Sequence, residues 1–205
     1  PYIPTKSKLV KSSIHGREGL ETIMEPTILD RSDGRYVHET TPLYEGVKHH
    51  GRLTMDFTST EVIRARERLW DGWLSSMKPI IAAPKVLTDE EAIVGFDYEY
   101  YTGMDLSTSA GYPFVCTPKK KKSDYIEVIK DDTLKNVGVK SISPMLLQIL
   151  EKKRALRNEG IVPMTLFVDT LKDEKRKHTK VMSLGGTRVF CNSPLDYVIE
   201  CRKYF

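Results

Sequence analysis

The longest stretch of this sequence without a charged residue runs from Leu106 to Pro118, only 13 residues of the 205. A helix that crosses a bilayer needs about 20 consecutive apolar residues, so the sequence predicts no transmembrane segment. The amino-terminal residues also lack the apolar run of a secretory signal. Because 40% of the residues are hydrophobic, the chain can still bury a core, and we expect a folded cytosolic protein.

The positive charge of the chain is concentrated in one place. Lysine and arginine together number 32 against 28 acidic residues, a net charge of +4. The segment from Lys172 to Arg188, called the basic segment below, contains six bases and two acids. Its net charge of +4 equals the net charge of the whole chain. A second basic cluster, Lys119 to Lys122, directly follows the uncharged loop Leu106–Pro118. Concentrated positive charge attracts phosphate groups and gains affinity from counterion release.

The clearest helix signal lies in the first half of the chain. Thr58 and Glu61 form a capping box before an apolar stripe, which predicts a helix over about 60–77. The spacing places Trp70 and Trp73 on the apolar face, so we expect both side chains in a core.

Further elements follow from capping residues and apolar spacing. The expected helices cover 88–94, about 123–130, 144 to about 160, and a segment that starts at 193–196. We expect a strand over 164–168 and a hairpin over 180–191 that turns at Gly185 and Gly186.

The two ends of the chain differ from its middle. Residues 1–57 contain many turn formers and predict an extended segment that packs on other parts of the protein. The apolar pattern of the last helix is cut off at Phe205. We therefore expect the chain to be part of a longer protein whose remainder supplies the packing partner of that helix.

Cysteine and histidine give no signal of a disulfide framework or a metal site. The three cysteines, Cys116, Cys191 and Cys201, are odd in number and lie in no CxxC spacing, which predicts buried free thiols. His49 and His50 are adjacent and point in different directions on any regular element, so a solvated pair is expected.

The sequence also lacks a self-contained catalytic motif. It contains no phosphate-binding GxxxxGK[ST], no GxGxxG and no GxSxG. The close carboxylates are Asp131 with Asp132 and Asp169 with Asp173. A solvated turn is the favoured interpretation of the first pair, and a structural one of the second, because Asp173 and Glu174 can pair with their basic neighbours. We expect no catalytic residue and no metal ligand in this chain.

Two stretches have residue types that suit nucleic-acid backbones. In the uncharged loop, the hydroxyls of Ser107, Thr108 and Ser109 can donate to phosphate oxygens, and Ala110 and Gly111 allow close approach of a strand. In the basic segment, Lys172, Arg176, Lys180 and Arg188 are spaced so that some of them can converge on one anion. A plain Ser/Thr-rich loop and a solvated charged hairpin are the alternatives.

These stretches carry a resemblance to a known family. GMDLSTSAGYPFV followed by a lysine cluster, and KDEKRKHTKV-x4-GTRVF about fifty residues later, resemble the fingers of the RNA-dependent RNA polymerases of picorna-like positive-strand RNA viruses. The similarity covers roughly residues 88–205, and PTKSKLVKSSIHG is closest to the dicistrovirus and iflavirus branch. Two ordered motifs at the family distance are more specific than either alone.

The resemblance implies an α+β fold that forms the fingers and fingertip of a right-handed polymerase, with the palm catalytic core and thumb absent. It divides the chain into a fingertip segment, 1–57, and a fingers subdomain, 58–205. Within the latter it implies a loop that admits the template, 105–118, and a basic hairpin at the nucleotide tunnel, 172–191.

The resemblance also implies functions for single residues. Those expected to guide template RNA are Ser107, Thr108, Ser109, Ala110, Gly111, Tyr112 and Pro113. Those expected to bind the triphosphate of the incoming nucleotide (NTP) are Lys172, Arg176, Lys180 and Arg188, with Arg188 and Lys172 foremost. Gly186 and His178 stand where related enzymes often have lysine, so two of the family's charges are missing or depend on protonation.

The family's chemistry is nucleotidyl transfer with Mg²⁺, or alternatively Mn²⁺, held by palm aspartates. This sequence has neither GDD nor DxxxxD, so we expect the chain alone to be inactive. The resemblance further implies template and nascent RNA, NTPs, the palm and thumb, and a protein primer as partners, and replication complexes in the host cytoplasm as the location. The alternative is a stand-alone basic RNA-binding or scaffolding protein without catalysis.

Overall fold

The computed structural model describes residues 5–19, 23–51, 56–78, 85–96, 101–133 and 135–204. The described residues form short helices and three two-stranded antiparallel sheets, as an α+β fold requires. The chain divides into two compact units, one of residues 51–86 and one of the remainder, and each is considered by itself.

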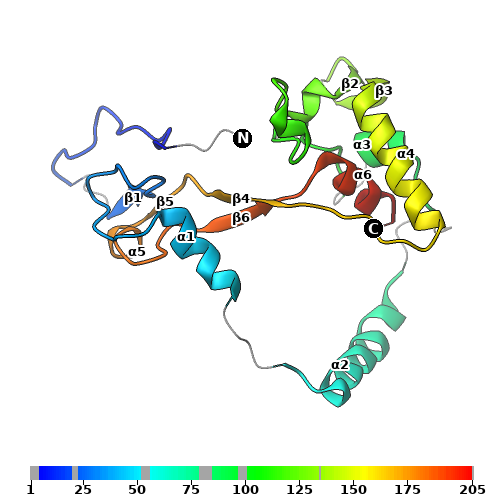
Figure 1. The fold of residues 1–205 in the computed structure, drawn as a ribbon, viewed down its shortest axis with the longest axis horizontal. Helices are drawn as coiled ribbons and strands as arrows, with labels where there is room; N and C mark the ends of the chain where they lie inside the picture. The colour runs from blue at the N-terminus through cyan, green and yellow to red at the C-terminus, as the bar shows by residue number, and fades with distance from the viewer. Residues whose placement is uncertain are drawn as a thin grey trace. The chain divides into compact units, whose positions relative to one another are not determined.

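The core of the larger unit lies between three helices and one hairpin (Figure 1). The helices are α3 (Asp89–Val94), α4 (Pro144–Asn158) and α6 (Leu195–Tyr204), and the hairpin pairs β2 (Ile126–Lys130) with β3 (Asn136–Ile142). The buried side chains are Ala92, Ile93, Met104, Ala110, Phe114, Tyr125, Ile126, Leu146, Leu150, Leu195 and Ile199.

The helices of this core begin where their capping residues predict. The Ser143 hydroxyl accepts a hydrogen bond from the backbone N–H of Leu146, and Pro144 occupies the first turn of α4. Helix α6 buries Leu195 and Ile199 completely. The expectation that its packing partner lies outside the chain was wrong, because α3 and α4 contact it here.

The helix expected over about 123–130 was also wrong. A short 3₁₀ turn, η4 (Lys122–Asp124), precedes strand β2. Ile126 is buried and Ile129 is half exposed, an alternation that suits a strand pairing with β3. The β-branched residues of this stretch fit the pleated surface of the hairpin.

The basic segment connects two paired strands, β4 (Val168–Leu171) and β6 (Val189–Asn192). The expected strand over 164–168 was misplaced, because the pairing with β6 begins only at Val168. The hairpin expected over 180–191 is absent. Its first residues instead belong to the short helix α5 (His178–Val181), which follows β5 (Lys175–Lys177), the strand that pairs with β1 (Met24–Pro26).

The amino-terminal residues pack on this part of the chain. Helix α1 (Pro42–Val47) and the 3₁₀ turn η1 (Lys48–Gly51) lie against β4 and β6 (Figure 1). The Thr41 hydroxyl caps α1. A Cβ on Gly46 would collide with the side chain of Val189, so only glycine allows α1 to approach β6 this closely.

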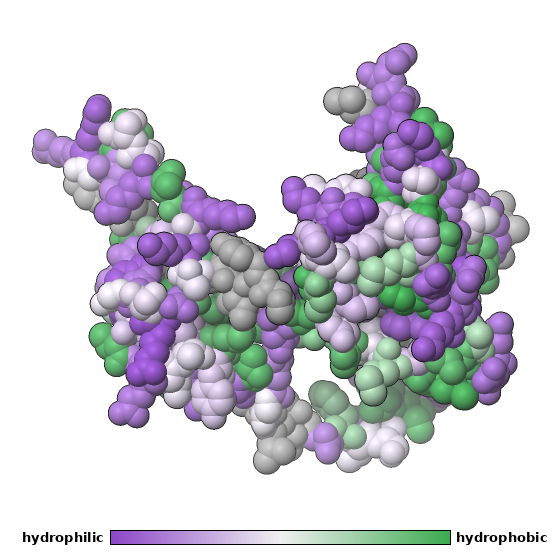
Figure 2. Space-filling view, turned by 45° about the horizontal axis from the view of Figure 1, so that its top comes forward, coloured by the Kyte–Doolittle hydropathy of each residue, from purple (hydrophilic) through white to green (hydrophobic). Residues whose placement is uncertain are grey.

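The smaller unit contains α2 (Ser59–Gly72) and the 3₁₀ turn η2 (Leu74–Ser76). The predicted capping box of Thr58 and Glu61 is present. The expected burial of the tryptophans was wrong for this unit by itself: Trp70 is 64% and Trp73 69% exposed, because none of the unit's described residues covers the apolar stripe. Figure 2 likewise shows apolar patches among the hydrophilic residues of the surface in view.

The cysteines and the length of the helices were also subjects of expectations. The cysteines are free, but Cys116 and Cys191 are exposed and Cys201 is partly exposed, so the prediction of buried thiols was wrong. None of the helices in the described ranges is long and apolar enough to cross a membrane.

Candidate nucleic-acid interface

The uncharged loop is fixed by backbone hydrogen bonds to the lysine cluster that follows it. The N–H of Ala110 donates to the carbonyl of Lys120 over 2.9 Å, and the N–H of Lys122 donates to the carbonyl of Thr108 over 3.0 Å. On its other side, the carbonyl of Ala110 accepts from the N–H of Leu195 at the start of α6. The loop is therefore held between the lysine cluster and the core.

Two of the three hydroxyls in this loop donate within the protein. The Ser107 hydroxyl donates to Asp105 over 2.6 Å, and the Thr108 hydroxyl donates to the carbonyl of Asp105. Thr108 also accepts from the ammonium of Lys122 over 2.7 Å. The Ser109 oxygen accepts from the N–H of Gly111, which leaves its proton free to donate. All three side chains are exposed.

Gly111 is the point of closest approach between the loop and the core. Its φ is +69°, and a Cβ there would lie 2.6 Å from the carbonyl oxygen of Ser193. The next residue, Tyr112, is exposed, while Phe114 is completely buried against Tyr125. The loop thus presents hydroxyls, Tyr112 and backbone outward from a base anchored by Phe114 and Ala110.

In the basic segment, three of the four expected phosphate ligands converge on one carboxylate, Glu174. Arg188 grips it with two guanidinium nitrogens, one of them at 2.6 Å. The ammonium of Lys172 lies 3.5 Å and Nε of Arg176 3.9 Å from the same group. Lys172 and Arg188 keep half or more of their side chains exposed, whereas Glu174 retains only 15%.

Backbone pairing explains this convergence. The N–H of Lys172 donates to the carbonyl of Arg188 over 2.9 Å, continuing the β4–β6 ladder by one residue. Thr27 and Glu174 exchange hydrogen bonds, and the Thr27 hydroxyl donates to the carbonyl of Lys172. Buried Thr27 thus holds the Glu174 backbone beside the end of the ladder.

The electrostatics of this group favour the ionised forms. The two hydrogen bonds from Arg188 lower the pKa of the Glu174 carboxyl below its ordinary 4.5. The same pairing raises the pKa of the Arg188 guanidinium. At neutral pH three cations face one anion, so the cluster keeps a net positive charge of two.

Lys180, the fourth expected phosphate ligand, lies apart from this carboxylate. It is on α5, whose last turn is closed by the hydrogen bond from the Ser183 hydroxyl to the Lys180 carbonyl. Gly186 is buried in the same turn: a Cβ there would collide with that carbonyl and lie 2.7 Å from the carbonyl oxygen of Ser183. In this conformation the turn has no room for a lysine at position 186.

His178 does not face the carboxylate of Glu174 either. Its ring nitrogen lies 2.9 Å from Glu25, and this pair ties α5 to β1. The Arg176 guanidinium donates to the carbonyl of Gly186. The first contact links the basic segment to β1, and the second links its β5 strand to the turn at Gly186.

The remaining acidic residues follow their expected structural uses only in part. Asp131 caps a solvated turn through Thr133 and Lys135. Glu174 pairs with basic neighbours as expected, but Asp173 instead accepts hydrogen bonds from Ser7 and Lys8 near the amino terminus. That contact spans the chain and has no signal in the local sequence.

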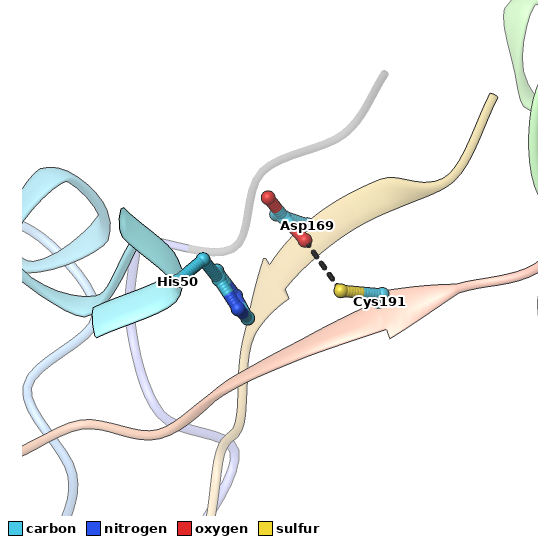
Figure 3. A group of neighbouring side chains, drawn as sticks. All are labelled: His50, Asp169 and Cys191. Carbon is cyan, nitrogen blue, oxygen red and sulfur yellow. Dashed lines mark hydrogen bonds between the residues drawn. The ribbon is translucent and has the colours of Figure 1, made fainter. Parts of the chain in front are cut away.

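One grouping has no signal in the sequence at all. His50, Asp169 and Cys191 come together with their ligand atoms within 4.8 Å of one another, the one such group of three found among the described residues (Figure 3). These residues come from three separate elements, and only the pairing of β4 with β6 beside η1 makes them neighbours.

Comparisons with known proteins identify the family. The model of the viral RNA-dependent RNA polymerase family matches residues 25–205. The replicase polyprotein of Drosophila C virus is 29% identical over 97% of this chain. The genome polyprotein of Human parechovirus 2 is 31% identical over 98%. The chain spans only 11% and 8% of these two polyproteins.

A solved structure agrees with the sequence comparisons. The Sicinivirus 3Dpol RNA dependent RNA polymerase matches 99% of this chain with a TM-score of 0.72 and 27% identity, and the chain covers 37% of it. The expected resemblance to polymerases of picorna-like viruses is confirmed. The chain therefore belongs to the viral RNA-dependent RNA polymerase family and has the fold of one portion of such an enzyme.

Proposed function

We propose that the chain is the fingers portion of a viral polymerase that copies RNA by template-directed nucleotidyl transfer, and that it positions both template and NTP. The observation that carries this proposal is the cluster of Lys172, Arg176 and Arg188 around Glu174. Three cations on one short segment form a charged surface of the kind that a triphosphate needs.

In this proposal Glu174 holds the site ready before the nucleotide arrives. Its carboxylate keeps the two arginines and Lys172 within reach of one point, and phosphate oxygens then take its place. Arg188 is the foremost ligand because it is more than half exposed and already grips an oxyanion with two nitrogens. Lys172 follows, and Lys180 adds charge from α5 without sharing the carboxylate.

The uncharged loop guides the template strand. The Ser109 hydroxyl and the Tyr112 ring are exposed toward a ligand, whereas Ala110 and Gly111 are buried against the core and hold the loop in place. The lysine cluster beside it supplies positive charge, since Lys119 and Lys121 are exposed. Thr108 and Ser107 shape the loop through Asp105 rather than lend a free proton.

The catalytic metal belongs elsewhere in the enzyme. In the part of the chain that the structure describes, the one group of three ligand residues includes a thiol and an imidazole, which do not suit Mg²⁺. We propose that residues outside this chain hold Mg²⁺, or Mn²⁺ in its place. Nascent RNA, a palm, a thumb and a protein primer are the further partners, and cytoplasmic replication complexes the location.

The test is the variant Arg188→Ala in a polymerase that contains this chain and the rest of the enzyme. We expect nucleotide incorporation to fall at least about a hundredfold, since charged positioning is worth about 2.7–4 kcal/mol in comparable sites, while template affinity changes less than about threefold. Primer extension and RNA binding measure the two quantities. Arg31→Ala, which removes an exposed arginine of the same unit, is the matched control.

Two results would contradict the assignment of Arg188 as a triphosphate ligand, and a third would contradict catalysis. Equal loss of incorporation and template affinity would make Arg188 an RNA ligand rather than a triphosphate ligand. No change in either would leave the cluster without a role in positioning. Salt-dependent RNA binding by a polymerase that never incorporates nucleotides would favour the non-catalytic RNA-binding alternative.

A further inference from the structure

His50, Asp169 and Cys191 form a cluster on the face of the β4–β6 ladder. Asp169 and Cys191 are directly opposite each other in the antiparallel register, so their side chains project from the same face. The Cys191 thiol donates to an oxygen of Asp169 over 2.8 Å, and His50 faces this pair from η1 (Figure 3).

The position of His50 over the ladder is fixed by tight packing of the preceding helix. Gly46 lets α1 approach Val189 of β6 at a distance that no side chain there would allow. Thr41 caps the same helix, and buried Glu45 accepts a hydrogen bond from Thr40 over 2.7 Å. The adjacent His49 is directed elsewhere, toward Gly185, whose Cβ position lies 2.6 Å from its Nε2 atom.

The donor set selects one class of ligand. An imidazole, a carboxylate and a thiolate together suit a borderline divalent cation such as Zn²⁺, whereas Mg²⁺ and Ca²⁺ require oxygen donors. Zinc bonds of about 2.0–2.3 Å place tetrahedral ligand atoms about 3.4–3.7 Å apart. The three donor atoms here lie within 4.8 Å of one another, and Cys191 Sγ lies 2.8 Å from an oxygen of Asp169. Side-chain rotations that move these atoms by about 1 Å, separating the close pair, complete the geometry.

We propose that His50, Asp169 and Cys191 bind Zn²⁺, with a fourth position open to water. Binding replaces the proton of the Cys191 thiol by the metal, so one proton is released for each ion bound. The site is separate from the cluster of cations around Glu174, although Lys172 directly follows β4 and Arg188 directly precedes β6.

Because the β4–β6 ladder forms the base of the basic segment, bound zinc would cross-link η1 to that base. The ion would resist the separation of α1 from the two strands. We therefore expect zinc to raise the thermal stability of the larger unit, since a ligand that binds only the folded state stabilises it by mass action.

Cobalt substitution tests the proposal because Co²⁺ reports thiolate ligation directly. Titration of the metal-free chain with Co²⁺ should produce a thiolate-to-metal charge-transfer band in the near ultraviolet and intense visible bands of a tetrahedral ion. Excess Zn²⁺ should remove these bands, and excess Mg²⁺ should not. The variant Cys191→Ser should abolish the charge-transfer band, and His50→Ala and Asp169→Asn should each weaken zinc affinity at least about tenfold.

Two matched variants separate a built site from adventitious binding. Cys116→Ser removes an exposed cysteine that lies outside the cluster, and His49→Ala removes the neighbouring histidine. Both should bind Co²⁺ as the parent chain does, with circular dichroism confirming that every variant is folded. Absence of the charge-transfer band from the parent chain, its survival in Cys191→Ser, or its equal loss in Cys116→Ser would each overturn the proposal.

Discussion

The uncharged loop and the basic segment reach their conformations by opposite means. The loop is closed by backbone hydrogen bonds to Lys120 and Lys122 and by contact of Gly111 with Ser193, so its shape depends little on charge. The basic segment is organised around the Glu174 carboxylate, and its side chains stay largely exposed. In the function proposed above, a rigid surface suits a template strand that slides past, whereas movable charges suit a nucleotide that arrives and leaves at every step.

The largest expected effect is that of a substitution at Gly111, which tests whether contact with the core fixes the loop. We expect Gly111→Ala to lower the free energy of unfolding by about 3 kcal/mol, because it adds a backbone collision to the cost of a positive φ. Gly160→Ala is the control, since Gly160 has a similar φ of +76° and no atom near its Cβ position. It should lose only about 1–2 kcal/mol in urea unfolding; equal losses would refute a contact-fixed loop.

Glu174→Gln tests the electrostatic half of the contrast. The amide keeps the shape of the side chain but removes the anion that competes with phosphate. We expect inorganic triphosphate to bind about three- to tenfold more tightly at low salt, as measured by calorimetry. Glu127→Gln, which breaks the exposed pair with Lys140, should leave this affinity unchanged. Weaker triphosphate binding to Glu174→Gln would show that the carboxylate shapes the site more than it occupies it.

Acid should weaken the pairing of Glu174 with its basic neighbours. Glu174 has a lowered pKa in the folded chain, so its stabilising effect is complete above its ordinary value of 4.5 and is lost as the pH falls through the folded value. The stability difference between the parent chain and Glu174→Gln should therefore be largest near neutrality and shrink between about pH 5 and pH 3. Urea midpoints across that range check the sign; a difference that grows in acid would contradict it.

The smallest expected effect concerns the Ser107 hydroxyl. Its proton is already donated to Asp105, so Ser107→Ala should lower stability by about 0.5–1 kcal/mol and change template affinity less than about twofold. Ser109→Ala removes the nearby hydroxyl whose proton is free to donate. Its larger effect should be on the affinity for template RNA rather than on the free energy of unfolding. The reverse ranking in filter binding would assign the RNA contact to Ser107.

The helices of the core were predictable because their signals are local. Ser143 with Pro144, and Thr88 with Glu91, mark helix starts within four residues, and the structure has helices there. Strand pairing depends on partners far along the chain, which explains the failures over 123–130 and 180–191. Nothing near Lys175 indicates that Met24–Pro26 will pair with it. The apolar stripe that contains Trp70 likewise does not indicate that Trp70 will stay exposed beside the described residues of its unit.

The candidate site was predictable to the same degree. The spacing of Lys172, Arg176 and Arg188 indicated a cluster, and the local sequence also indicated that Glu174 pairs with them. The separation of Lys180 could not be foreseen, because it follows from the turn that buries Gly186. The grouping of His50 with Asp169 and Cys191 depends on the packing of α1 over a sheet, for which one sequence carries no signal.

The pairing of β1 with β5 also sets an order of events during synthesis. Met24–Pro26 leaves the ribosome long before Lys175–Lys177, and it must wait as an unpaired strand edge until its partner appears. Contacts between residues so distant in sequence form slowly, because a long loop must close before they gain any energy. Glu174 is hydrogen-bonded to Thr27, which directly follows that strand. The charged cluster around Glu174 is therefore among the last features of the chain to form.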